Sequence, residues 1–169
     1  MPLITGKPLP LDARLILQDI MVAAGVQQCE ITSVARTPAD QARVMFANLV
    51  GTGLHQGIAE QRKLYLPPGN QIIDVYEQNA SLPADQVQAL MAARIQEVGP
   101  QLVSHHCCDP SKMTVWDIDP ATVKPPEKLP AFEAALAAAV ADGRLSKLLS
   151  PHNADPALHC ERPVGELPT

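Results

Sequence analysis

The predicted fold depends most on one short stretch, Met113-Thr114-Val115-Trp116-Asp117-Ile118. Successive side chains of a β-strand point to opposite faces of a sheet, so Asp117 lies out of phase with Trp116 and Ile118. The two apolar side chains are expected in the core, and the carboxylate is expected on the opposite face. The stretch therefore predicts a strand that brings an acidic side chain to one face of a sheet.

Histidines follow the same alternation in two further predicted strands. Near the carboxyl-terminal end, His159 and Glu161 share one face. In an earlier strand only one of His105 and His106 can face a given ion, because neighbours on a strand point apart. Two imidazoles and a carboxylate on one face are typical of a Zn²⁺ site with water in the fourth position, although the spacing also fits histidines that only fill the interior. The remaining histidines, His55 and His152, are expected at the surface.

Other elements are predicted from hydrophobic periodicity. Apolar residues at helical spacing predict helices over residues 11–24, 37–49, 81–98 and 127–142. Further strands are expected at residues 29–35, 102–106, 145–149 and 157–161. Residues 51–80 have no clear pattern, since Pro67-Pro68-Gly69 predicts a break and residues 72–76 fit either a strand or a helix.

The order of these elements favours an α+β fold, because helices cluster early in the chain and strands late. We expect a small antiparallel sheet that carries the zinc site and is flanked by helices. The 169 residues, 46% of them hydrophobic, are expected to form a single domain spanning residues 1–169.

Charge and composition argue against several classes of protein. The formal net charge is −5, and the longest run of basic residues is the pair Arg62-Lys63. Neither phosphate attraction to nucleic acid nor a polybasic membrane anchor is therefore expected. The longest apolar stretch, residues 134–141, is far shorter than the ~20 residues that cross a bilayer. The amino terminus has no signal-peptide pattern, so we expect synthesis in the cytoplasm with reduced cysteines.

Four short motifs follow one another along nearly the whole chain. They are Ser33-Val34-Ala35-Arg36-Thr37-Pro38-Ala39-Asp40-Gln41, Ser104-x-His106, Val115-Trp116-Asp117-Ile118 and Asp155-Pro156-Ala157-Leu158-His159-Cys160-Glu161. This series resembles the zinc D-alanyl-D-alanine carboxypeptidase family, which includes vancomycin-resistance D,D-dipeptidases and phage L-alanyl-D-glutamate endolysins. That family shares its fold with the hedgehog signalling domain, so the resemblance implies a hedgehog-like fold.

The resemblance also implies roles for individual residues. The implied Zn²⁺ ligands are His106, Asp117 and His159. Arg36 is implied to polarise the scissile carbonyl and to stabilise the developing oxyanion, which suits a permanently charged guanidinium. Gln41 and Ser104 are expected to contribute to substrate binding.

Two residues compete for the role of general base, which takes a proton from zinc-bound water and hands it to the leaving amine. In the family this is an acid three residues before the last histidine, a position that Pro156 occupies here. Asp155, one residue further away, is the favoured candidate, and Glu161 is the alternative.

The spacing between the first two ligands also departs from the family. Ten residues separate His106 from Asp117, more than is usual, and Asp109 within that interval is an alternative ligand. The neighbouring cysteines are expected to be small buried hydrophobic residues rather than ligands or nucleophiles. These are Cys107, Cys108 and Cys160.

The expected function is therefore a zinc metallopeptidase that hydrolyses a bond in the stem peptides of bacterial peptidoglycan. It would act as a D,D-carboxypeptidase or an L,D-endopeptidase, with zinc-bound water as nucleophile. The alternative is an inactive peptidase-like module that binds or assembles within a phage or a secretion apparatus. Because peptidoglycan lies outside the cytoplasmic membrane, delivery by phage lysis or by a secretion apparatus is expected.

Overall fold

The computed structural model describes residues 1–53, 56–153 and 155–165. Contacts within the chain divide it into two compact units. The sheet unit comprises Met1–Ala35 and Asp109–Thr169, and the helical unit comprises Arg36–Cys108. The described residues form seven α-helices and five strands, so the chain is a mixed α/β protein. The expectation of a single domain stays a prediction.

One five-stranded sheet, in the order β1-β2-β3-β5-β4, forms the base of the sheet unit. Its strands are β1 (Leu3–Gly6), β2 (Gln28–Val34), β3 (Met113–Ile118), β4 (Lys147–Leu149) and β5 (Leu158–Pro163). The pairs β2–β3, β3–β5 and β4–β5 are antiparallel, but β1 runs parallel to β2.

The prediction of an antiparallel sheet is therefore wrong at one edge, and the sheet is mixed. The cause is β1, a four-residue strand that the sequence analysis did not identify. A helix connects β1 to β2, and a crossover of this kind returns the chain in the same direction.

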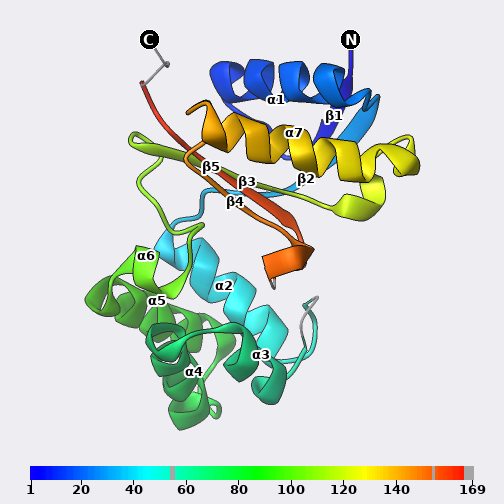
Figure 1. Cartoon of the computed structure of the whole chain (residues 1–169). Helices are drawn as coiled ribbons and strands as arrows, with labels where there is room; N and C mark the ends of the chain where they lie inside the picture. Colours follow the sequence, from blue (N-terminus) through cyan, green and yellow to red (C-terminus); the bar gives the residue numbers. More distant parts are fainter. Residues whose placement is uncertain (54–55, 154, 166–169) are drawn as a thin grey trace. The chain divides into compact units, whose positions relative to one another are not determined.

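Helices α1 (Leu11–Ala24) and α7 (Leu129–Ala141) lie side by side over one face of the sheet (Figure 1). Helix α1 spans the predicted residues 11–24 and is followed by Gly25, whose φ of 72° is the left-handed conformation that glycine adopts without strain. Its N–H donates to the carbonyl oxygens of Met21 and Val22 and so caps the helix. Short 3₁₀ turns occur at η1 (Pro120–Thr122), η2 (Pro126–Lys128) and η3 (Pro151–Asn153).

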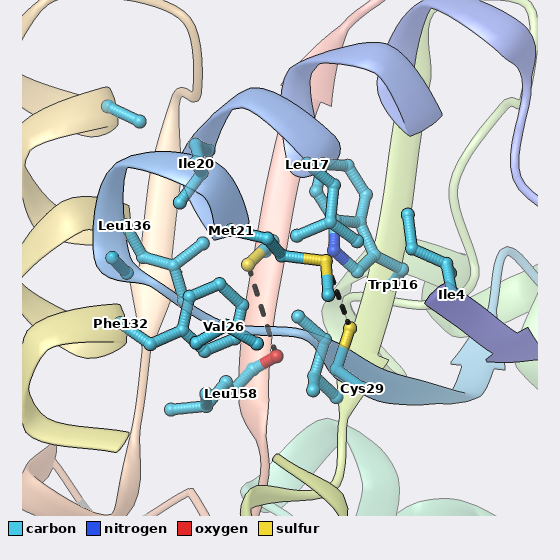
Figure 2. Close-up of a cluster of buried hydrophobic side chains, with 14 of the residues drawn as sticks. Ile4, Leu17, Ile20, Met21, Val26, Cys29, Trp116, Phe132, Leu136 and Leu158 are labelled. Atoms are coloured by element: carbon cyan, nitrogen blue, oxygen red, sulfur yellow. Dashed lines mark hydrogen bonds between the residues drawn. The ribbon is translucent and has the colours of Figure 1, made fainter. Parts of the chain in front are cut away.

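The core of the sheet unit fills the space between these two helices and the sheet. Leu17, Met21, Phe132 and Trp116 are fully buried there. Figure 2 shows Met21 beside Cys29, whose thiol donates to the Met21 sulfur at 3.7 Å. The predicted inward direction of Trp116 is thus confirmed, and its neighbours along β3 must point to the opposite face.

The helical unit is a separate cluster of five helices. They are α2 (Pro38–Leu49), α3 (Ile58–Leu64), α4 (Pro67–Asn79), α5 (Ala84–Val98) and α6 (Pro100–Val103). Fully buried Met45, Ile72, Met91 and Ile95 form its own apolar core. Thr37 caps α2, since its hydroxyl accepts a hydrogen bond from the Asp40 N–H at 3.1 Å.

Two segments of the helical unit differ from the prediction. The expected break at Pro67 is instead the first turn of α4, where the missing proline N–H costs nothing, and residues 72–76 are helical. The strand expected at residues 102–106 is wrong. Gly99 and Pro100 start the short helix α6 there, and the Ser104 N–H closes it by donating to the Pro100 carbonyl at 3.1 Å.

None of the helices within the described ranges is both long and apolar enough to cross a membrane.

Candidate metal centre

Strands β3 and β5 bring Asp117 and His159 together. The two residues are direct partners in the antiparallel register, so their side chains project from the same face. The Nδ1 atom of His159 lies 2.9 Å from Oδ1 of Asp117. Their chain neighbours Trp116 and Cys160 point into the core, so this pair occupies the face that α1 and α7 leave uncovered.

A β-bulge in β2 directs a further polar residue to this face. Ile31 pairs with Ile118 on the core face, but two residues later Ser33 pairs with Asp117 on the opposite face. Residues two apart on a regular strand share a face, so the register shift between Ile31 and Ser33 is what turns Ser33 away from the core. The local irregularity therefore adds a buried hydroxyl group beside the Asp117 position.

The other nitrogen of His159 contacts Glu161. Its Nε2 atom lies 3.2 Å from Glu161 Oε1, and the ring is only 2% exposed. Burial disfavours the charged ring and is the largest single influence on the pKa of His159. The hydrogen bonds and charges of Asp117 and Glu161 together outweigh it, so the pKa of His159 lies above its ordinary value.

Lys147 is a neighbour of this site that the sequence analysis missed. It stands opposite Glu161 in the β4–β5 register, with its Nζ atom 3.6 Å from Glu161 Oε1. A charge pair across adjacent strands is decided by strand order and register, which the local sequence does not reveal. Glu161 is thus held between an imidazole and an ammonium group.

His106 lies just beyond α6, in a turn and not in the predicted strand. Its N–H donates to the Ser104 hydroxyl oxygen at 3.3 Å, and its carbonyl accepts from the Arg36 N–H at 2.7 Å. The side chain of His106 is buried, whereas His105 is exposed. The preference for His106 over His105, which came from the Ser-x-His pattern, stays a prediction.

The three implied ligands fall in both units. Asp117 and His159 lie together in the sheet unit, and His106 belongs to the helical unit. Two imidazoles and a carboxylate fit a divalent transition metal, and Zn²⁺ is one ion that favours this donor set.

The alternative ligand Asp109 is not part of this group. Its carboxylate accepts hydrogen bonds from the N–H and the hydroxyl of Ser111, at 2.9 and 2.7 Å, within an exposed turn. The choice of Asp117 over Asp109 stays a prediction.

Asp155 lies in the turn that precedes β5. Its Oδ1 atom accepts a hydrogen bond from the Ala157 N–H at 2.9 Å, which orients the carboxylate. Its role as general base stays a prediction.

Arg36 belongs to a hydrogen-bond network inside the helical unit. Its Nη1 atom donates to Gln41 Oε1 at 3.1 Å, and Gln41 Nε2 donates to the Tyr65 hydroxyl oxygen at 2.8 Å. Gln41 is completely buried, so any contribution that it makes to substrate binding passes through its neighbours. The sequence analysis missed Tyr65, which lies 24 residues from Gln41 and has no local motif.

All four cysteines are buried and free. Desolvation raises the pKa of the Cys107 thiol to about 11, and burial likewise raises the pKa of Cys160. Both thiols therefore remain protonated at neutral pH, as expected of small hydrophobic residues. His152 is exposed as predicted, and His55 lies outside the described residues.

Comparison with protein-family models, with curated proteins and with solved structures finds no match to this chain.

Proposed function

We propose that this chain is a zinc-dependent peptidase that cleaves a bond in the stem peptides of bacterial peptidoglycan, as a D,D-carboxypeptidase or an L,D-endopeptidase. The observation that carries the proposal is the pairing of Asp117 with His159 in the sheet unit, where Nδ1 of His159 lies 2.9 Å from Oδ1 of Asp117. The motif order that resembles the zinc D,D-peptidases assigns the metal to these two residues and to His106. A hedgehog-like fold is part of this proposal and rests on the same motifs.

Glu161 orients the ring of His159 in this proposal. A histidine that ligates a metal commonly donates its other ring N–H to a carboxylate, which selects the tautomer. Here Nε2 faces Glu161 at 3.2 Å and Nδ1 faces Asp117 at 2.9 Å, so a proton on Nε2 leaves Nδ1 as the ligating atom. Lys147, at 3.6 Å from Glu161, helps to hold that carboxylate in place.

The remaining chemistry falls to Asp155 and Arg36. When bound, Zn²⁺ acts as a Lewis acid and lowers the pKa of water from 15.7 to about 7. Asp155 accepts a proton at its carboxylate and returns it to the leaving amine, because Glu161 is already engaged by His159 and Lys147. Arg36 donates hydrogen bonds to the carbonyl oxygen, where negative charge develops.

The test combines metal analysis with digestion of purified peptidoglycan and of synthetic stem peptides, followed by mass spectrometry. We expect about one zinc per chain and cleavage that a chelator abolishes and added Zn²⁺ restores. Cleavage that continues in chelator would exclude the mechanism. Stoichiometric zinc without cleavage of any fragment would support the inactive binding module instead.

Two carboxylate variants separate the proposed roles. Asp155→Asn should lower kcat by about 10²–10⁴, the range for loss of a general base, while the zinc content stays unchanged. Glu161→Gln should instead weaken zinc binding by about 10- to 100-fold, as found for partners that orient metal ligands. If Glu161→Gln retains full zinc affinity and loses turnover, Glu161 is the base and the assignment of Asp155 is wrong.

A further inference from the structure

Helix α1 carries an apolar stripe on the side opposite its buried residues. Residues 11, 15, 18 and 22 follow one another at spacings of four, three and four, which places them in one line along the helix. Three of them are aliphatic and exposed: Leu11 at 72%, Leu15 at 52% and Val22 at 64%. A surface helix usually carries polar residues on this side. The stripe instead has the spacing with which one helix packs against another.

Helix α7 lies beside α1 and presents a surface of small residues (Figure 1). Its exposed residues from position 131 onward are all alanines: Ala131, Ala134, Ala137, Ala138 and Ala141. The only charged residue of this helix is Glu133, whose carboxylate lies 3.0 Å from Nε2 of His152. The two helices therefore form an aliphatic ridge beside a low area of alanine, which together we call the α1–α7 surface.

The charges around this surface argue against a lipid membrane as its partner. Arg14 is the only basic residue of the two helices, and Asp12 and Asp19 stand on the same helix. Helices that bind a membrane surface carry many Lys and Arg residues, which meet anionic headgroups. An apolar surface without them fits a protein partner better.

We infer that the α1–α7 surface is the interface of a homodimer. In a two-fold symmetric pair the same surface of both copies meets, so that surface must be complementary to itself. The α1–α7 surface fulfils this condition, because α1 of each copy packs on α7 of the other. Each of the two contacts then sets large side chains against alanines, so that the facing layers interdigitate.

The size of the surface agrees with a weak dimer. Helices of 14 and 13 residues are each about 20 Å long, and two side by side are about 20 Å wide, so the surface projects onto roughly 400 Å² per copy. Protruding side chains add to this area, so a pair buries on the order of 1,000 Å², near the lower limit for specific interfaces. We therefore expect a dissociation constant of about 10–100 µM.

This inference goes beyond the proposed function and does not rest on it. Within the sheet unit, Asp117 and His159 project from the face of the sheet that α1 and α7 leave uncovered. Dimerisation through the two helices therefore does not involve these side chains. Zinc binding and dimerisation should respond to different substitutions, and either can fail while the other holds.

Sedimentation equilibrium of the full chain over about 1–500 µM measures the association. We expect the average mass to rise with concentration from 18.1 kDa toward twice that value. Leu15→Glu/Val22→Glu should weaken the dimer at least 100-fold, because the new carboxylates would be buried without partners. Both positions are exposed in a single copy, so this variant should keep the wild-type circular dichroism spectrum.

Leu82→Glu/Leu90→Glu is the matched control, because it adds the same charges at two exposed leucines of the helical unit. It should dimerise as the wild-type chain does.

Mixing two variants tests the arrangement of the helices. Ala134→Lys/Ala138→Lys should also weaken the dimer when studied alone. An equal mixture with Leu15→Glu/Val22→Glu should dimerise again, because one of the two contacts then pairs Lys with Glu and the other keeps its natural residues.

Four results would overturn the inference. They are a chain that stays monomeric at the highest concentration, a dimer that Leu15→Glu/Val22→Glu does not weaken, a control that is weakened equally, and a mixture that does not dimerise. Sedimentation of the monomeric chain with vesicles of phosphatidylcholine and phosphatidylglycerol, lost in Leu15→Glu/Val22→Glu, would also overturn it and make a lipid surface the partner.

Discussion

Zinc should stabilise this protein against heat, and replacing a single buried histidine should abolish the effect. His106→Ala removes one of the three proposed ligands, whereas His105→Ala removes its exposed neighbour and spares all three. The two variants differ by one position in the chain and carry the same chemical change. They therefore form a matched pair for the metal site.

The size of the effect follows from mass action. A ligand present at 100 times its dissociation constant stabilises the folded state by about 2.7 kcal/mol. For a chain of 150–250 residues, each kcal/mol corresponds to roughly 2–4 °C in Tm, so saturating zinc should raise the Tm by about 5–10 °C. His105→Ala should keep this shift, and His106→Ala should lose nearly all of it.

The assay is thermal unfolding followed by circular dichroism, with each variant measured in chelator and in excess Zn²⁺. Each protein is compared with itself, so a change in intrinsic stability does not confuse the result. Isothermal titration then measures affinity and stoichiometry directly. A wild-type protein without a zinc-dependent shift, or a His106→Ala variant that keeps the full shift while His105→Ala loses it, would refute the ligand assignment.

Three further substitutions test the packing that supports the site. Asp12→Asn leaves the Arg162 guanidinium, only 3% exposed, without its charged partner. The free energy of unfolding, measured in urea, should fall by about 1–2 kcal/mol. This is less than the loss of a partner in a fully buried pair, because Asp12 is half exposed. Desolvation raises the pKa of Asp12, but hydrogen bonds and the charge of Arg162 outweigh it, so the pKa lies below the ordinary value of 3.8. The ionised Asp12 therefore stabilises the folded protein above pH 3.8, and this stabilisation is lost as the pH falls through the lowered pKa. The difference in unfolding free energy between wild type and Asp12→Asn should vanish in acid, and a difference that stays constant with pH would contradict this. Thr37→Ala removes the cap of α2 and should cost about 1 kcal/mol, measured in the same way, and a neutral result would show that the cap is dispensable. In a helix interior, alanine is more stable than glycine by about 0.5–1 kcal/mol. Gly69→Ala should nevertheless destabilise the protein, because the new Cβ would clash with Tyr65. A higher Tm in thermal unfolding would count against the described packing.

Local patterns predicted most of the regular elements. Helix α1 and its stop at Gly25 follow from apolar spacing and from the left-handed conformation of that glycine. Strand β3 follows from the alternation of Trp116 and Asp117. Each of these signals depends on residues a few positions apart, which is why the sequence alone reveals them.

The wrong predictions of secondary structure concern segments whose local sequence pattern fits more than one structure. The apolar pair at residues 102–103 fits a strand, but Pro100 after Gly99 favours a helix start, and four residues give too little periodicity to decide. Strand β1 has only four residues and depends on its partner β2 for hydrogen bonds. Its direction, and hence the mixed character of the sheet, cannot be inferred from its own side chains.

The amino-acid sequence by itself determined which side chains are available to bind a metal: two histidines and an aspartate in separate motifs. It also determined the phase of Asp117 and His159 on their strands, because that phase depends only on the two-residue period of extended chain. Tertiary structure alone decided that β3 and β5 are neighbours, that Asp117 stands opposite His159, and that Glu161 and Lys147 meet beside them. Strand order and register are set by contacts between residues tens of positions apart, and no local spacing encodes those contacts.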